Sequence, residues 1–340
     1  MIFLTTLISV ATMVALALPG FILRKKNMLP EKAVATLVTV LIYASQPFLT
    51  ISSFLNKDYH PKLLINMAIT FGFSIAIHII VFFVAKLVFS FFKVKKGEDE
   101  SDEDYAVRRE SCDKQNRIST ISSFMGNIGF MGIPVMKLLF PDKPEMLIYT
   151  AVFMVGFNIS AWTLGVFALT GDKKNISLKS AFLNPAVATL SIALLLFFFK
   201  QYIPTKVIEP ISTGIDYLAE MTLPLSMIIL GIRLADMKAT ALLSSPKSYL
   251  ACGMKLLVAP LLTLGLALLV KLIFPALSGT VIKAIFICMA MPSAAMNLSF
   301  AEMFGGDREA AVRNVLLSTI LSVVTIALLM FLAEAIPVLG

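Results

Sequence analysis

Apolar stretches long enough to cross a lipid bilayer recur along almost the whole of this chain. The sequence has 340 residues, of which 58% are hydrophobic and only 15% are charged, and its mean hydropathy is +0.88. A soluble domain carries about 25% charged residues, and a helix needs about 20 consecutive apolar residues to span the hydrocarbon core. We therefore expect an all-α polytopic membrane protein.

Ten such stretches can be delimited in the sequence. We interpret the first as a retained span rather than a signal peptide, because no basic segment precedes it and its apolar part is too long. The ten predicted spans are residues 2–23, 33–55, 63–92, 117–139, 146–170, 179–200, 207–234, 247–274, 280–304 and 310–336.

Lys and Arg residues are unevenly shared between the two sets of loops. Nineteen lie in odd-numbered loops, with Arg233 counted among them, and eight lie in even-numbered loops. Basic residues mark cytoplasmic loops, so we expect the odd loops in the cytoplasm and both termini on the extracytoplasmic side. Lys86 and Lys255 lie inside predicted spans, from which their long side chains can snorkel toward an odd loop. The net charge of +8 thus indicates membrane topology rather than nucleic-acid binding.

Few features outside the spans suggest chemistry of their own. Residues 94–116 mix acidic and basic side chains densely, which is typical of a solvated loop. The cysteines Cys112, Cys252 and Cys288 lack metal-ligand spacing. The chain has neither a phosphate-binding GxxxxGK[ST] motif nor a hydrolase or metalloprotease motif. We expect no metal, no cofactor and no enzymatic activity.

The chain carries signs of an internal repeat. The segments FILRKKNMLP and FFFKQYIP both end an apolar stretch with basic residues and close on an aliphatic residue and proline. Each is followed by a span with an internal proline, Pro47 or Pro224, and farther on by Pro134 or Pro292. Because each half has five spans, the second half runs upside down relative to the first, as in many secondary transporters. We expect ten transmembrane helices in two inverted five-helix repeats.

The fourth and ninth spans contain segments that break a helix. GNIGFMGIP, which ends at Pro134, holds Gly126, Gly129 and Gly132, and MAMPSAAMN holds Pro292 followed by small residues. Glycine costs about 1 kcal/mol in a helix interior and proline about 3 kcal/mol. Non-helical backbone at membrane depth is tolerated only where it lines a cavity or is buried in protein. We predict that helices 4 and 9 are broken, restart near their prolines and cross near the bilayer midplane.

Two restarted helices that face one cavity form an anion site. Each presents free N–H groups and about half a positive charge at its N-terminus. The alternative is that the glycines and prolines only permit close helix packing, and we assign Asn158 and Trp162 to packing. The predicted substrate site comprises Tyr43, Gln46, Asn127, Gly129, Gly132, Pro134, Pro292, Ser293 and Asn297.

Three acidic residues are candidates for coupling transport to Na+ or H+. Asp216 and Glu220 are four residues apart and share a helix face. Glu220 falls near the middle of its span, where an ionised carboxylate costs about 2.5–3.5 kcal/mol. Glu302 follows Pro292 in the ninth span. For Glu220, a structural pairing with a residue such as Lys255 is the alternative.

Three motifs combine in a pattern that is known from one family. They are GNIGFMGIP, MTLPLSMIILGIRLA at residues 221–235, and the segment from Met291 to Asp307, in which MP precedes AEMFGGD. Together they resemble the auxin efflux carrier family, which includes plant auxin exporters and bacterial carriers of malate or malonate. The plant members place a long cytoplasmic insert between spans five and six, whereas here the insert lies between spans three and four. This difference favours a bacterial-type carrier of an organic acid.

The resemblance, which covers essentially the whole chain, implies a division of labour between helices. A scaffold domain would hold helices 1, 2, 6 and 7, and a transport domain would hold helices 3–5 and 8–10. The corresponding boundaries are residues 1–62 and 171–240 for the scaffold, and residues 63–170 and 241–340 for the transport domain.

The resemblance also implies a mechanism. The broken helices would cross at Pro134 and Pro292, a carboxylate would bind beside Asn127, the movement would be elevator-like, and homodimers would form through the scaffold. We expect a secondary active or facilitative carrier of a small organic anion in the plasma membrane. The alternatives are a sodium-coupled symporter of the bile-acid carrier type, and a channel or sensor.

Overall fold

The computed structural model describes residues 2–55, 61–177, 179–180, 185–236 and 245–337, and helices are the only extended secondary structure in these ranges. The helices of the first half are α1 (Ile2–Ala15), α2 (Leu18–Lys25), α3 (Ala33–Val40), η1 (Leu41–Ser45), α4 (Gln46–Leu55), α5 (Pro61–Ser90), α6 (Asp102–Phe124), η2 (Ile128–Gly132), α7 (Ile133–Leu139), α8 (Pro144–Ser160), η3 (Ala161–Gly165) and α9 (Val166–Thr170). Those of the second half are η4 (Lys173–Asn175), α11 (Pro185–Phe199), η5 (Lys200–Tyr202), α12 (Thr205–Glu220), α13 (Thr222–Ala235), α15 (Pro246–Gly253), η6 (Met254–Val258), α16 (Ala259–Ile273), α17 (Gly279–Ala290), α18 (Met296–Met303) and α19 (Arg308–Glu334).

The lengths and composition of these helices define a multi-pass membrane protein. Six uninterrupted or bent helical stretches are long and apolar enough to cross a bilayer, namely Ala33–Leu55, Pro61–Ser90, Pro144–Thr170, Thr205–Ala235, Pro246–Ile273 and Arg308–Glu334. Three further apolar helices are shorter, at Ile128–Leu139, Val187–Tyr202 and Gly279–Ala290. The all-helical membrane fold is therefore confirmed, and the number ten and the inverted repeat stay predictions.

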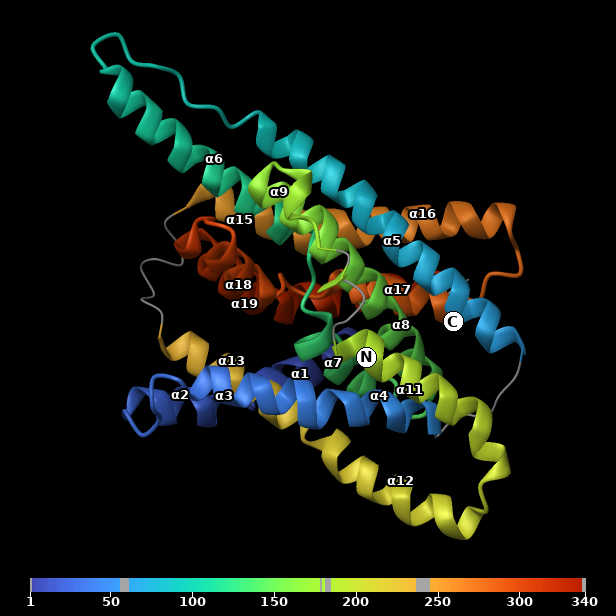
Figure 1. Ribbon diagram of the computed structural model, residues 1–340. Coiled ribbons are helices and arrows are strands. Elements are labelled where there is room, and N and C mark those ends of the chain that lie inside the picture. The colour runs from blue at the N-terminus through green and yellow to red at the C-terminus, as the bar shows by residue number, and fades with distance from the viewer. Residues whose placement is uncertain (1, 56–60, 178, 181–184, 237–244, 338–340) are drawn as a thin grey trace.

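The helices fall into two groups in space (Figure 1). The lower group in this view holds α1–α4 and α11–α13, in which α2 packs against α13 and α4 packs against α11 and α12. The upper group holds α5, α6, α8, α9 and α15–α19, in which α5 packs against α6 and α8, and α16 packs against α17. α1 also contacts α19, so the two groups meet along the middle of the molecule.

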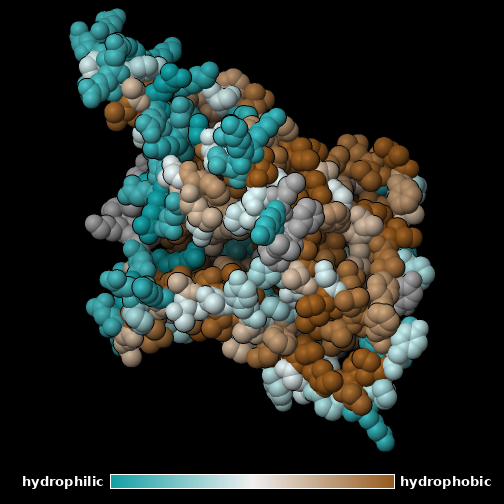
Figure 2. All heavy atoms as spheres, viewed as in Figure 1, coloured by the Kyte–Doolittle hydropathy of each residue, from teal (hydrophilic) through white to brown (hydrophobic). Residues whose placement is uncertain are grey.

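The odd-numbered and the even-numbered loops of the sequence analysis lie on opposite sides of the molecule. The end of α2, the end of α13 and the start of α15 lie on the left in Figure 1, whereas the end of α16 and the turn between α11 and α12 lie on the right. In this view hydrophilic residues gather on the left and at the upper tip, and hydrophobic residues dominate the right side (Figure 2). Leu272 and Ile273 are 79% and 86% exposed, as expected of side chains that face lipid.

The charged insert differs from its expected form. Only its first part is irregular, because α6 begins at Asp102 and continues into the fourth span. The Ser101 side chain accepts a hydrogen bond from the Asp104 N–H at 3.0 Å and caps this helix. The acidic first turn also suits the positive end of the helix dipole. Residues 102–116 therefore form a helical extension that projects from the upper tip of the molecule (Figure 1).

The fourth and ninth predicted spans are both interrupted. α6 ends at Phe124 and α17 ends at Ala290, and short extended segments follow each end. Gly126 in the first segment pairs with Ser293 in the second as an isolated antiparallel bridge. Both segments are therefore interrupted, as predicted, and the two breaks meet at the centre of the fold. Their numbering as helices 4 and 9 of ten stays a prediction.

Candidate functional site

Backbone hydrogen bonds join the two broken segments directly. The Asn127 N–H donates to the Pro292 carbonyl at 2.7 Å, and the Ala294 N–H donates to the Met125 carbonyl at 2.9 Å. These bonds satisfy polar groups that would otherwise be left without partners away from water. The two extended segments therefore hold each other in place.

The sequence predicts that the helices restart near their prolines, and the structure gives the first helical residues as Ile128 and Met296 rather than the prolines themselves. After the first break the chain resumes at Ile128, well before Pro134, and after the second it resumes at Met296, beyond Pro292. The reason is that the crossing hydrogen bonds keep residues 125–127 and 292–294 extended, so the helices restart where this pairing ends. Pro134 instead lies near the start of α7, where η2 has already begun the helix.

Both restarted helices begin with N–H groups that lack partners. Within the described residues, no acceptor is found for the N–H groups of Gly129 and Phe130 in η2, or for those of Ala295 and Met296 at the start of α18. The first N–H groups of a helix have no carbonyl partner within it, and the helix dipole adds positive potential there. Such helix starts bind anions readily.

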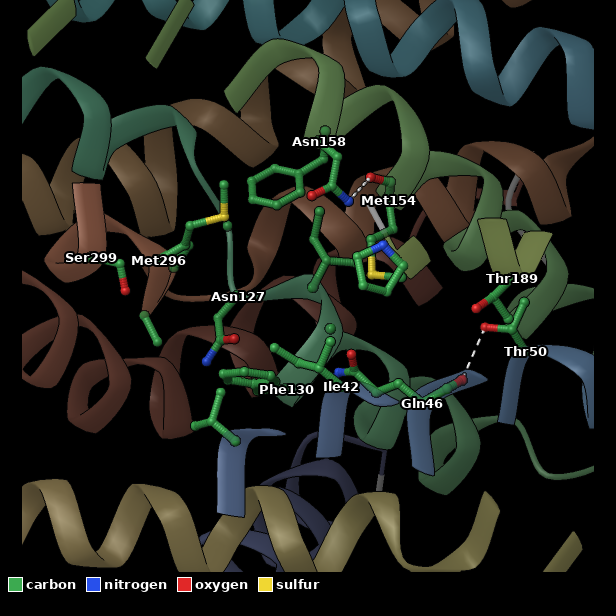
Figure 3. Close-up of a pocket in the computed structure, with 18 of the residues that line it drawn as sticks. Ile42, Gln46, Thr50, Asn127, Phe130, Met154, Asn158, Thr189, Met296 and Ser299 are labelled. Atoms are coloured by element: carbon green, nitrogen blue, oxygen red, sulfur yellow. Dashed lines mark hydrogen bonds between the residues drawn. The ribbon is translucent and has the colours of Figure 1, made fainter. Parts of the chain in front are cut away.

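These four residues line one cavity. The cavity has a volume of about 330 Å³ and lies between the two groups of helices. Its other lining residues come from α3, η1, α4, the two broken segments, η2, α8, η3, α11, α13 and α18 (Figure 3). They are Val38, Ile42, Tyr43, Gln46, Pro47, Thr50, Gly126, Asn127, Ile128, Met154, Phe157, Asn158, Trp162, Pro185, Thr189, Arg233, Ala294 and Ser299. A site of this size lies at the small end of the range for ligand pockets, about 300–1,000 Å³.

Two amide side chains in the cavity have hydrogen-bonding capacity to spare. Asn127 is half-buried, and its side chain forms no hydrogen bond with any residue that the structure describes. The Gln46 Nε2 atom is buried and also lacks a partner in the described part of the chain. In Figure 3 the amide end of Gln46 points toward the side of the cavity where Asn127 lies. A Cβ on Gly129 would stand 2.9 Å from Gln46 Nε2, so a larger residue there would displace the end of the Gln46 side chain.

A cationic side chain in the cavity was missed at the sequence level. Arg233, in the last turn of α13, lines this cavity and also a small adjoining cavity of about 20 Å³ that it shares with Asn127. No ion pair or hydrogen bond joins its guanidinium to any described residue. We had counted Arg233 with a cytoplasmic loop because it follows a long apolar run. Its helical register, seven residues after the buried Ser226, was the available signal.

The predicted substrate-binding residues divide into two sets. Tyr43, Gln46, Asn127 and Gly129 line the cavity, and Tyr43 is 65% exposed at its edge. The others are buried and lie outside the cavity lining, and they are Gly132, Pro134, Pro292, Ser293 and Asn297. Asn158 and Trp162, which we had assigned to packing, are part of the cavity wall.

The buried set fixes the crossing to the surrounding helices. The Ser293 hydroxyl donates to the Ser122 carbonyl at 2.7 Å, and the Ser293 N–H donates to the Ser318 hydroxyl at 3.0 Å. The Asn297 Nδ2 atom lies 3.4 Å from the Ser122 hydroxyl. These bonds tie the second broken segment to α6 and α19.

The three acidic candidates for ion coupling lie outside the cavity lining. Asp216 accepts a hydrogen bond from Ser52 at 2.5 Å, and Glu302 forms an ion pair with Arg308 at 3.0 Å. Glu220 is exposed at the end of α12. Their coupling roles stay predictions that the position of the cavity does not favour.

A helical membrane protein with crossed, broken helices around a central cavity has the architecture of a transporter, and comparisons with known proteins agree. A family model described as "Membrane transport protein" matches residues 173–330. The chain is 24% identical over 331 residues to an uncharacterized transporter of Methanocaldococcus jannaschii, covering 92% of this chain and 94% of the relative. It is 25% identical over 342 residues to an uncharacterized transporter of Methanothermobacter thermautotrophicus, covering 96% of this chain and 98% of the relative. The matched family model and both relatives are membrane transporters, which agrees with the resemblance that the sequence motifs show.

Proposed function

We propose that this protein carries a small organic anion, a carboxylate, across the plasma membrane by alternating access. The observation that supports this most strongly is the meeting of two unsatisfied helix starts in one cavity, at Gly129 and Phe130 and at Ala295 and Met296. A carboxylate accepts several hydrogen bonds at once, and N–H groups at helix starts need acceptors.

Side chains around these helix starts complete an anion site. Arg233 offers a fork of donors that matches a carboxylate. The amides of Asn127 and Gln46 add neutral donors close to the crossing. Among the described residues, none that lines the cavity is acidic, so a bound anion meets no like charge in this lining.

The rest of the cavity wall suits a carbon skeleton. Ile42, Phe130, Met154, Phe157 and Trp162 present apolar surface. Specific ligand sites combine such a wall with a few placed polar groups. The substrate class that fits is therefore a small mono- or dicarboxylate with an apolar portion.

The position of the cavity supports an elevator-type movement. Its wall is shared between the lower group, which supplies Gln46 and Arg233, and the upper group, which supplies Asn127, Asn158 and Trp162. A shift of one group against the other would carry the crossing past the wall of the lower group. In this proposal the lower group is the scaffold, with residues 1–62 and 171–240, and a homodimer forms through it.

The membrane topology is part of the same proposal. Ten spans in two inverted repeats would place the basic odd loops in the cytoplasm and both termini outside it. The common side on which α2 and α13 end and α15 begins supports this arrangement.

Binding to the purified protein tests the function. We expect saturable heat of binding for a small carboxylate and none for the uncharged amide of the same skeleton. Proteoliposomes loaded with the same carboxylate should show counterflow of a labelled portion, which a channel does not give. Equal binding of the acid and the amide, or flux without counterflow, would contradict the proposal.

A further inference from the structure

Lys255 is a charged residue in the middle of the membrane fold with no exposed surface. Its exposure is 0%, and it lies in η6 between α15 and α16. We had expected the side chain to snorkel toward a loop. Instead its Nζ donates a hydrogen bond to the Met289 carbonyl at 2.7 Å, in the last turn of α17.

The ammonium group lies directly behind the crossing. A Cβ built on Gly126 would stand 3.2 Å from Lys255 Nζ and 3.5 Å from the Cys288 carbonyl oxygen. Gly126 follows the end of α6, and Cys288 and Met289 form the end of α17. Helix C-termini carry about half a negative charge on carbonyls that lack partners. Lys255 therefore lies at the end of α17 and beside the segment that follows the end of α6, while the two helix starts face the cavity.

The positive charge of Lys255 has no acidic counterpart. Within the described residues, no Asp or Glu forms an ion pair with it, and its titratable neighbours are Cys288 of α17 and His78 of α5. Lys283 gives the contrast, because it is 5% exposed, lies on the same α17 and pairs with Glu334 at 3.1 Å. Burial of a charge is costly unless other groups compensate it. Among the described residues, the acceptor that Lys255 Nζ has is the Met289 carbonyl in the last turn of α17.

We propose that the Lys255 ammonium is a built-in cation, which fills the place between the ends of α6 and α17 that a bound alkali cation would otherwise occupy. Oxygen atoms are the ligands of such hard cations, and the tethered ammonium donates to one such oxygen, the Met289 carbonyl. The carrier then needs no sodium to hold its crossing together. This proposal deepens the proposed carrier function, but thermal stability tests it without any substrate.

The test compares sodium and choline, which is too large for such a site. Wild-type protein should have the same melting temperature and the same carboxylate affinity in NaCl and in choline chloride. Lys255→Met removes the charge, and Lys255→Gln keeps a donor for the Met289 carbonyl. Both variants should melt lower than wild type in choline and regain a large part of the loss in sodium. The regain should saturate with sodium concentration.

Lys283→Met is the matched control, since it neutralises another buried lysine of the same region. It should lose stability equally in the two salts. A melting temperature of wild type that rises saturably with sodium would overturn the proposal, and would point to the polar cluster of Ser122, Asn297 and Asn314 as a true ion site. Lys255 variants that are equally unstable, or equally unfolded, in both salts would overturn it as well. Failure of carboxylate binding in wild type would refute the carrier function and leave the stability result standing.

Discussion

The two interrupted helices meet at one point but use their polar side chains differently. In the first, Asn127 is half-buried, and its amide has no partner in the described part of the chain. In the second, Ser293 is fully buried and forms hydrogen bonds with Ser122 and Ser318. Both segments contribute helix starts to the cavity, yet only the first contributes a polar side chain from its break. The first segment therefore has a side chain free to bind a ligand, whereas the side chain of the second stabilises the crossing.

Among the substitutions considered, neutralising Arg233 should lower the carboxylate affinity most. Arg233→Gln removes the only arginine or lysine that lines the described cavity. Loss of one partner from a desolvated charge pair costs about 2–5 kcal/mol, so carboxylate affinity should fall by roughly thirtyfold or more. Calorimetric titration measures this loss. Arg308→Gln, which removes an exposed arginine paired with Glu302, should leave the affinity unchanged. If both variants bind like wild type, Arg233 is not part of the site.

Asn127→Ala tests the first segment itself. A hydrogen bond to a charged group contributes about 1.5–3 kcal/mol, so affinity should fall by roughly tenfold to a hundredfold. The melting temperature should not change, since the side chain has no partner among the described residues. Asn297→Ala, the corresponding change in the second segment, should leave affinity intact because Asn297 lies outside the cavity lining. If Asn297→Ala lowered the affinity and Asn127→Ala did not, the second segment rather than the first would contact the substrate.

Ser293→Ala should affect stability rather than binding. The change leaves the Ser122 carbonyl without its donor in a fully buried place, which costs about 1–3 kcal/mol. Thermal unfolding in detergent should show a lower melting temperature with an unchanged dissociation constant for the carboxylate. A large loss of affinity with unchanged stability would mean that the second segment contacts the guest through its side chains.

Gly129→Ala should have the smallest effect on affinity, and it tests how closely the cavity fits its ligand. The new methyl group would stand 2.9 Å from Gln46 Nε2 and 3.4 Å from Met154 Sδ, and both are ends of flexible side chains. These side chains have to move into the cavity, so affinity should fall by about 1 kcal/mol, and more for the larger carboxylates of a series. Gly132→Ala lies behind the cavity and should show no dependence on substrate size.

Much of the fold could be predicted from the sequence because lipid imposes strict rules on composition. The long apolar runs, the broken fourth and ninth spans and their crossing all follow from the cost of polar backbone and charge in hydrocarbon. The points of restart at Ile128 and Met296 could not be predicted, since they depend on hydrogen bonds between segments far apart in the chain. Proline marked the neighbourhood of each break but not the first helical residue.

Part of the cavity lining could be predicted for a similar reason, and the binding roles of its residues stay predictions. Asn127 and Gly129 belong to a helix break and Tyr43 and Gln46 precede Pro47, and all four line the cavity. The positions of Arg233 and Lys255 were predicted wrongly. The rule places basic side chains in loops or lets them reach toward loops, and it fails when a basic side chain has a partner inside the protein. The cavity faces Arg233 and a carbonyl faces Lys255, and neither partner is visible in the local sequence.

A structure of the protein with a bromine-labelled carboxylate bound is the most direct test of the central claim. The account predicts that the carboxylate group lies within hydrogen-bonding distance of the N–H groups at the starts of η2 and α18, with Arg233 and Asn127 as its side-chain partners. A carboxylate bound elsewhere, with both helix starts still unoccupied, would contradict it.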